Sequence, residues 1–217
     1  MSNISKNLSK IISEIESLSK NKVTLVAVTK NRTVDLMQEV IDCGVKNIGE
    51  NRIQEATEKF PLLEREVTKH LIGHLQTNKA KQAVKMFDLI HSVDSEHLAG
   101  AIDKAANSIG KIQDILIQVN LAKEDSKSGI YEEDLQKLID KVDMFQNLRL
   151  RGLMLIAPNY DDVENCRPLF RCMKKIFDEL RDVRKNFDFL SMGMSHDYKI
   201  AVEEGANVVR IGTAIFI

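Results

Sequence analysis

The sequence predicts an α/β fold: a single (β/α)8 barrel of the TIM type with an extra N-terminal helix, formed as one domain by residues 1–217. Short apolar runs alternate with amphipathic stretches about eight times along the chain. The longest runs are apolar throughout, which is typical of parallel strands buried on both faces. No change of composition marks a second domain. About eight strands allow the sheet to close on itself, and a doubly wound open sheet is the alternative.

Helical spacing and turn residues define the individual elements. Apolar residues recur at helical spacing over 4–18, so the chain opens with an amphipathic helix. Thr33 can cap a second helix and Gly44 can end it. Pro61 stops the next helix, 54–63. Further helices are expected at 80–86, 95–106, 132–145, 161–183 and 197–204. The predicted strands are 23–29, 45–48, 70–72, 89–93, 112–119, 148–156, 188–192 and 208–211.

Composition and charge exclude several classes of protein. With 43% hydrophobic and 29% charged residues, the chain has the balance of a soluble folded protein. The formal net charge is -1, so no global field favours nucleic acid. No apolar run approaches the ~20 residues of a membrane span, and residues 1–6 lack the apolar core of a secretion signal. Cys43, Cys166 and Cys172 form no Cys-x-x-Cys pair, which indicates reduced thiols in a cytoplasmic protein without a zinc site.

The first predicted strand runs directly into Lys30. Because α/β folds bind ligands at the carboxyl ends of their strands, this ammonium group would face the ligand-binding rim. We expect partial desolvation there, which favours the neutral amine that attacks carbonyl groups. Lys30 is therefore a candidate Schiff-base lysine. The alternative is an ordinary surface lysine that ends a strand.

Glycine follows an apolar residue at the end of four predicted strands. Glycine allows close approach of the backbone to a ligand and leaves N–H groups free to bind an anion. Near the last two strands, Ser195, Gly212 and Thr213 add hydroxyl and N–H groups where barrels bind phosphates. Ser195 can also act as a helix N-cap, and the two roles are compatible. The four pairs are Ile48-Gly49, Ile72-Gly73, Met192-Gly193 and Ile211-Gly212.

The sequence does not determine the interaction partners of an arginine and of two histidines in or beside the predicted strands. Arg210 lies inside the apolar strand 208–211, and a buried arginine needs acceptors because its charge cannot be neutralised. A structural carboxylate and a ligand in the barrel mouth are equally good partners for it. His70 and His74 flank a strand end and do not share one face of a helix, which disfavours a metal pair.

Seven blocks carry a resemblance to a known family. Along the chain they are 27–30, 48–55, 71–79, 127–129, 152–154, 191–195 and 209–216. Together they resemble the pyridoxal phosphate homeostasis proteins, also called the YggS or PROSC family. The resemblance implies a (β/α)8 barrel like the N-terminal domain of bacterial alanine racemase. The chain departs from the family pattern at Ile48, at Lys69-His70 and at Ile217, and none of these positions is the candidate lysine or the candidate phosphate loop.

The resemblance also implies a cofactor, pyridoxal 5′-phosphate (PLP), and roles for individual residues. Lys30 matches the lysine that forms a Schiff base with PLP. Arg210 matches an arginine beside the pyridine nitrogen, which keeps that nitrogen unprotonated and the ring a poor electron sink. Asn51 matches a residue beside the cofactor. The positions that match the phosphate-binding residues are Ser195, Gly212 and Thr213.

The implied function is PLP homeostasis: the protein holds the cofactor, limits its free aldehyde and delivers it to apo PLP-dependent enzymes, as a monomer. A PLP-dependent amino-acid racemase is the alternative. Racemases of this kind take a second base from a C-terminal β-domain. The last predicted strand lies close to Ile217, so we expect that domain, and established catalysis, to be absent. A phosphosugar aldolase that uses Lys30 is a weaker alternative, because no general acid or base is apparent beside the lysine.

Overall fold

The computed structural model describes residues 2–124 and 127–217 and contains a closed barrel of eight parallel strands, as the sequence predicts. The strands are β1 (Thr24–Val28), β2 (Asn47–Glu50), β3 (Thr68–Leu71), β4 (Leu89–Val93), β5 (Gln113–Val119), β6 (Leu148–Leu155), β7 (Phe189–Met194) and β8 (Val208–Ile211). They follow one another around the barrel in chain order. Pairing of Val26 in β1 with Arg210 in β8 is part of the parallel ladder that closes the ring.

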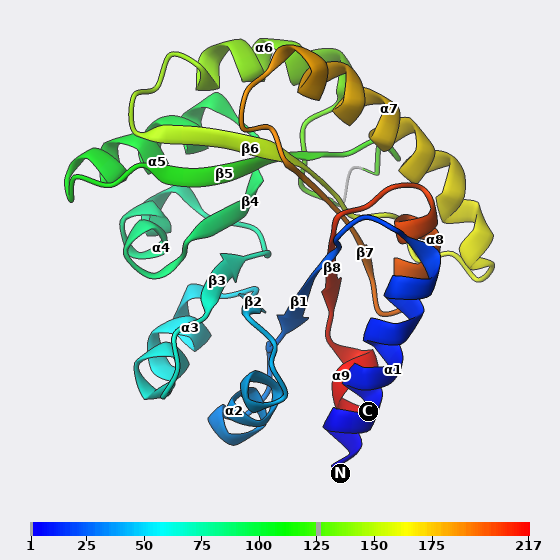
Figure 1. The fold of residues 1–217 in the computed structure, drawn as a ribbon. Coiled ribbons are helices and arrows are strands. Elements are labelled where there is room, and N and C mark those ends of the chain that lie inside the picture. The colour runs from blue at the N-terminus through cyan, green and yellow to red at the C-terminus, as the bar shows by residue number, and fades with distance from the viewer. Residues whose placement is uncertain (1, 125–126) are drawn as a thin grey trace.

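Helices cover the outside of the barrel (Figure 1). The α-helices are α1 (Asn3–Leu18), α2 (Val34–Asp42), α3 (Ile53–Lys59), α4 (Ala80–Met86), α5 (Glu96–Asn107), α6 (Glu132–Val142), α7 (Arg167–Val183), α8 (Tyr198–Glu203) and α9 (Thr213–Phe216). Three 3-10 turns are η1 (Phe60–Leu62), η2 (Thr77–Lys79) and η3 (Val163–Cys166). In the parts of the chain that the structure describes, no helix is both long enough and apolar enough to cross a membrane.

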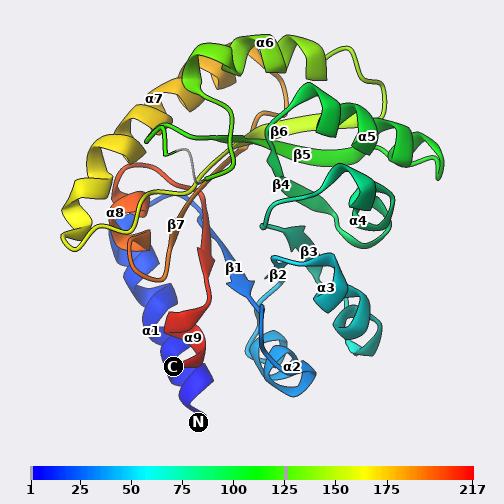
Figure 2. The ribbon, with the colours of Figure 1, turned by 180° about the vertical axis from the view of Figure 1, so that it is seen from behind.

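The extra N-terminal helix is confirmed, and it packs beside the C-terminal end of the chain. Figures 1 and 2 show α1 alongside α8 and α9, with the two termini near each other. The side-chain amide of Asn7 donates to the carbonyl oxygen of Ile215 across 3.1 Å. Tyr198 in α8 donates its phenolic O–H to Glu14 in α1. The helix therefore braces the segment that follows the last strand.

The differences from the predicted elements have local causes. The predicted helix 161–183 divides into η3 and α7, because Pro168 lacks an N–H and fits only the first turn of a helix. The predicted helix 54–63 is α3 followed by η1, where Pro61 again lies in the first turn. The short helix α9 was not predicted, since four residues are too few to show a helical period. The cap at Thr33 is confirmed: its hydroxyl accepts from the N–H of Leu36.

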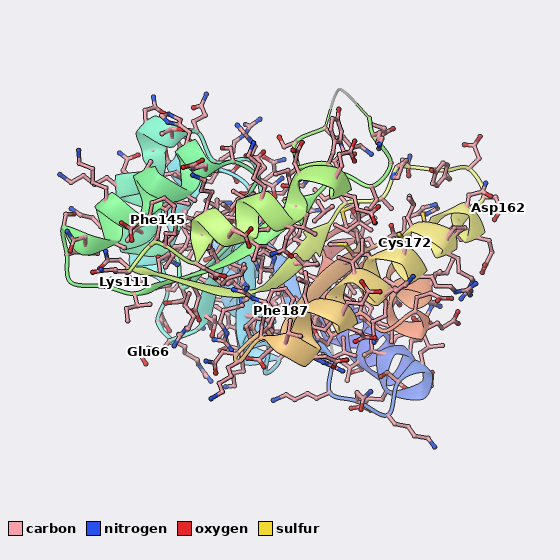
Figure 3. The ribbon with its side chains drawn as sticks, turned by 90° about the horizontal axis from the view of Figure 1, so that it is seen from above. Glu66, Lys111, Phe145, Asp162, Cys172 and Phe187 are labelled. Carbon is pink, nitrogen blue, oxygen red and sulfur yellow. The ribbon has the colours of Figure 1, made fainter. Side chains whose placement is uncertain are left out.

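Buried apolar side chains form two separate clusters. The larger one fills the space between strands and helices and includes Phe187, which is labelled in Figure 3. Phe187 stacks on Phe177 of α7 with ring centroids 5.4 Å apart. The smaller one consists of Leu89, Leu116 and Met154. Because it does not join the outer layer, we assign it to the barrel interior. The interior also contains the buried polar side chains described below.

Candidate functional site

A cavity of about 270 Å³ opens at the carboxyl ends of the strands. Val28 and Ile72 give it an apolar wall, with Ile156 after β6 and Met194 at the end of β7 also lining it. The structure brings all six residues singled out from the sequence to this cavity. They are Lys30, Asn51, Ser195, Arg210, Gly212 and Thr213.

Lys30 lies in a turn directly after β1 and is exposed. Its exposed position gives no support to the expectation that the amine is partly desolvated. The turn is closed by the N–H of Arg32, which donates to the carbonyl oxygen of Thr29 across 3.1 Å. Asn31 has a φ of 57°, the left-handed conformation that asparagine tolerates better than most residues. The turn thus fixes the backbone on both sides of the lysine while its side chain stays accessible.

A cluster of three charged side chains holds the two neighbours of this lysine. The hydroxyl of Thr29 donates to Oε1 of Glu50 across 2.7 Å. The N–H of Asn31 donates to Oε2 of Glu55 across 2.8 Å. Lys59 joins the two carboxylates, since its Nζ lies 3.1 Å from Glu50 Oε1 and 2.7 Å from Glu55 Oε2. The same Nζ donates to the carbonyl oxygen of Thr29. We call Glu50, Glu55 and Lys59 the turn clamp.

The turn clamp is only partly accessible to water. The side chain of Glu50 is completely buried, and one of its oxygens, Oε2, has no hydrogen-bond partner among the described residues. Burial raises the pKa of Glu50, while the hydrogen bond from Thr29 and the charge of Lys59 oppose that rise. A buried carboxylate of this kind depends on its cation, because removal of one partner leaves an uncompensated charge.

The anion-binding end of the cavity is formed after β7 and β8. The hydroxyl oxygen of Ser195 accepts hydrogen bonds from the N–H groups of Gly212 and Ala214, each across 3.2 Å. Thr213 lies between these two donors and adds a hydroxyl group. These N–H groups and hydroxyls are donors that a phosphate oxygen can also accept from. Asp197 does not line the cavity, and one of its carboxylate oxygens accepts from the N–H of Met194.

Arg210 projects from β8 into the barrel and is only 3% exposed. Its Nη1 donates to the hydroxyl oxygen of Ser191 across 2.6 Å, and its Nη2 donates to the carbonyl oxygen of Leu155 across 2.9 Å. Burial lowers the pKa of Arg210 to about 10, against the opposing charge of Asp197, so the guanidinium stays charged at neutral pH. In the described chain, no carboxylate forms an ion pair with Arg210. Of the two partners considered from the sequence, a structural carboxylate and a ligand, the ligand is therefore favoured.

Asn51 follows β2, and its position depends on a glycine in the next loop. A Cβ atom on Gly73 would lie 2.3 Å from the carbonyl oxygen of Asn51, which is closer than atoms can approach. Glycine is therefore required where β3 ends beside Asn51. Of the other three glycines of the strand-end pattern, Gly212 also follows its strand, whereas Gly49 and Gly193 lie inside β2 and β7.

Several residues of the site were not singled out from the sequence. His196 lines the cavity, and its Nε2 donates to the carbonyl oxygen of Tyr160 across 3.4 Å. Its place next to Ser195 was the only available signal. Ala214 was missed because a backbone N–H has no residue-specific signature. Glu55 and Lys59 have a signal in their i,i+4 spacing, but that spacing is also common on solvated helix faces.

A larger hollow of about 560 Å³ opens at the opposite, amino-terminal end of the barrel. Its wall includes Asn47 and His70, together with charged residues that pair with each other. Arg151 lies 2.8 Å from Asp114, for example. None of the six candidate residues lies there. The chemistry therefore favours the smaller cavity as the ligand site.

Comparison with known proteins places the chain in a family. The model of the alanine racemase N-terminal domain matches residues 2–217. The chain is 38% identical to the pyridoxal phosphate homeostasis protein of Aquifex aeolicus, over 99% of this chain and 97% of that protein. For the protein of that name in Haemophilus influenzae, identity is 35% over 99% and 95%.

Solved structures agree with this placement. PipY of Synechococcus elongatus, described with PLP bound, superposes with a TM-score of 0.89 at 36% identity, over 99% of this chain and 100% of that chain. An alanine racemase of Clostridium difficile shares the fold at a TM-score of 0.74 and 16% identity, and the match covers 97% of this chain and 59% of the racemase. The chain belongs to the alanine racemase N-terminal domain family and, within it, to the pyridoxal phosphate homeostasis proteins.

Proposed function

We propose that this chain binds pyridoxal 5′-phosphate on Lys30 as a Schiff base and serves to store and carry the cofactor inside the cell. The observation that carries the proposal is the gathering of three chemically distinct groups around one cavity: the Lys30 amine, the donors around Ser195, and the Arg210 guanidinium. An aldehyde, a phosphate and a pyridine ring nitrogen are the matching groups of PLP. That PipY is described with PLP bound supports the assignment.

The residues fit this cofactor. When bound, PLP supplies an electrophilic aldehyde that is conjugated to an aromatic ring. The Nζ of Lys30 would hold the cofactor by condensing with this aldehyde, with release of one water molecule and with no oxidant or reductant involved. The turn clamp fixes the backbone at Thr29 and Asn31, so the lysine side chain starts from a defined position.

The other residues hold the remaining parts of the cofactor. Ser195, Gly212 and Thr213 would bind the phosphate through hydroxyl and N–H donors. The guanidinium of Arg210 can only donate hydrogen bonds and gives up no proton at neutral pH. A pyridine nitrogen placed against it would stay unprotonated, and the ring would then withdraw electrons weakly. Asn51 would contact the side of the ring.

Carriage is favoured over catalysis because few groups beside the cavity can move a proton. Among the described residues that line it, the titratable side chains are Lys30, His196 and Arg210. Of these, Arg210 cannot act as a base, and the lysine is occupied by the cofactor in our proposal. The exposure of Lys30 also leaves a path by which water or an amine can release PLP. We propose apo PLP-dependent enzymes as the recipients, a monomer as the working form, and the cytoplasm as its location.

One observation favours the second candidate, a racemase-like enzyme. Lys30 and His196 line the same cavity, so two groups able to take and give a proton lie beside one ligand. Two-base racemisation requires such groups on opposite faces of the substrate. His196 is exposed and its Nε2 donates to a backbone carbonyl group, which does not position it as a base.

The test is the absorption spectrum of the protein with PLP, before and after borohydride reduction, followed by mass spectrometry of the modified peptide. We expect a reducible complex with PLP trapped on Lys30, and no trapped complex in Lys30→Ala. The matched control is Lys175→Ala, which removes a lysine that is 78% exposed on α7. Turnover of free amino acids that depends on both Lys30 and His196 would instead support the racemase. Absence of any complex in the wild-type protein would refute both candidates.

A further inference from the structure

A continuous chain of hydrogen bonds crosses the barrel interior from Arg210 to the amino-terminal hollow. Arg210 Nη1 donates to Ser191 Oγ across 2.6 Å, and Ser191 Oγ lies 3.0 Å from His91 Nδ1. His91 Nε2 lies 2.9 Å from His70 Nδ1, and His70 Nε2 lies 3.0 Å from Asn47 Oδ1. Because β4 and β7 are not neighbours in the barrel, the bond between His91 and Ser191 spans its lumen.

The chemistry of the two ends sets the direction of every bond. Arg210 can only donate, so Ser191 Oγ is an acceptor on that side. At the other end the Asn47 carbonyl oxygen can only accept, so His70 carries its proton on Nε2 and presents a bare Nδ1. His91 then carries its proton on Nε2, and its bare Nδ1 accepts the hydroxyl proton of Ser191. If the chain ran the other way, Ser191 would keep an unpartnered hydroxyl proton in a buried site, which is costly.

The directed chain of hydrogen bonds also explains how the Arg210 guanidinium can be buried without a carboxylate as its partner. In the described chain, the protein acceptors for the guanidinium are Ser191 Oγ and the Leu155 carbonyl oxygen. A hydroxyl that donates to a further acceptor is itself a stronger acceptor, because the bonds polarise one another. Both histidines are buried, His70 at 4% and His91 at 0% exposure, and burial lowers the pKa of each, so neither ring competes with Arg210 as a second cation.

We propose that Ser191 and His91 are positioning residues for the ligand: they hold the guanidinium of Arg210 in place at the cavity, and His70 with Asn47 fixes the tautomer of His91 that makes this possible. The inference rests on the proposed function, since it takes PLP as the ligand that Arg210 faces. Beyond the proposed function, the inference assigns a role in ligand binding to residues that lie outside the cavity and act on the ligand only through Arg210. The chain thereby links ligand binding to the opposite end of the barrel.

The test is a double-mutant cycle on PLP affinity. Ser191→Ala should weaken PLP binding by about tenfold, the size expected for loss of a charge-assisted hydrogen bond. In an Arg210→Gln background, the same Ser191→Ala change should weaken binding by less than about twofold, because its partner is already absent. A residue with a merely structural role would produce the same loss in both backgrounds.

Two substitutions whose new side chains have the same shape test the role of His91. His91→Asn keeps an acceptor for the Ser191 hydroxyl, and His91→Leu removes it. We expect the leucine variant to bind PLP about tenfold more weakly than wild type and the asparagine variant to recover most of that loss. Met154→Leu, in the apolar part of the interior, is the control for repacking and should bind like wild type.

A measurement on the ligand-free protein separates this inference from the proposed function. The guanidinium nitrogen resonances of Arg210 should be sharp in wild type and exchange-broadened in Ser191→Ala and His91→Leu. Sharp signals in these variants with unchanged PLP affinity would overturn the positioning role while leaving PLP binding intact. Equal losses of affinity in both Arg210 backgrounds would also overturn it. Failure of the wild-type protein to bind PLP would overturn the proposed function and this inference together.

Discussion

The backbone N–H of Asn31 donates to Oε2 of Glu55 across 2.8 Å, so the residue after Lys30 is held by a side chain of helix α3. The residue before it, Thr29, is held in the same way by Glu50 of β2. Lys59 bridges the two carboxylates. The conformation of the lysine turn therefore depends on charged residues that do not line the ligand cavity. Our first prediction concerns the cation at the centre of this turn clamp.

Lys59→Met should destabilise the protein and weaken PLP binding. Methionine keeps most of the unbranched side chain but leaves Glu50 buried without its cation, which costs about 3 kcal/mol in comparable cases. The loosened turn should also lower the fraction of PLP held covalently by Lys30. Both effects can be measured, by denaturant unfolding and by borohydride trapping.

The control for this prediction is Lys175→Met, which removes a lysine that is 78% exposed and should change neither quantity measurably. The double variant Glu50→Gln/Lys59→Met should regain part of the lost stability, because the uncompensated charge is gone. An unchanged free energy of unfolding in Lys59→Met would show that the turn clamp does not stabilise the fold.

The buried histidine pair should make the protein sensitive to acid. The pKa of His70 falls from 6.5 to about 4 because of burial, and burial, with the charges of His70 and Arg210, lowers that of His91 well below its usual range. A group with a lowered pKa takes up its proton first in the unfolded chain. Its contribution to stability is therefore complete above about pH 6.5 and is lost as the pH falls toward 4. For His70 alone, the loss between pH 7 and pH 4 is about 3 kcal/mol.

The measurement is the free energy of unfolding of wild type and His70→Gln between pH 7 and pH 4. We expect the wild type to lose more stability than the variant over this range, since glutamine cannot take up a proton. His97→Gln, at an exposed position on α5, should follow the wild-type curve. Parallel curves for wild type and His70→Gln would contradict the prediction.

The barrel could be predicted from the sequence because the signals for its strands and helices lie within short stretches of the chain. Apolar runs place every strand, and capping residues such as Thr33 place helix starts without knowledge of the fold. Lys30 and Arg210 could be singled out for the same reason, as charged residues at the end of, or inside, an apolar strand. Their convergence on one cavity followed from the rule that strand carboxyl ends meet at one rim.

What could not be predicted depends on contacts between distant residues. His91 and Ser191 are 100 residues apart and lie on strands that do not pair, so no spacing connects them. His70 could be argued not to share a metal with His74, but its real partner, His91, had no signal. The exposure of Lys30 was also missed, because strand position alone does not say whether neighbouring side chains cover a terminal lysine.

Gly73→Ala should damage both the fold and the site. The new Cβ atom would lie 2.3 Å from the carbonyl oxygen of Asn51, so the loop after β2 must move. We expect a loss of about 2 kcal/mol of stability and weaker PLP binding through displacement of Asn51. Gly100→Ala is the matched control, because its Cβ would meet Phe145 at an ordinary 3.4 Å within helix α5. That change should be neutral or stabilise the helix by up to about 1 kcal/mol.

Ser195→Ala should weaken binding of PLP more than binding of pyridoxal, its counterpart without a phosphate. The hydroxyl oxygen of Ser195 organises the N–H groups of Gly212 and Ala214, and in our proposal its proton is also donated to the phosphate. The preference of the wild-type protein for PLP over pyridoxal should fall by about tenfold in the variant.

Dissociation constants for both ligands, measured by absorbance for wild type, Ser195→Ala and the exposed control Ser9→Ala, give this ratio directly. If the two ligands lose affinity equally, Ser195 supports the whole pocket rather than the phosphate. If only PLP loses affinity, the turn after β8 is the phosphate site.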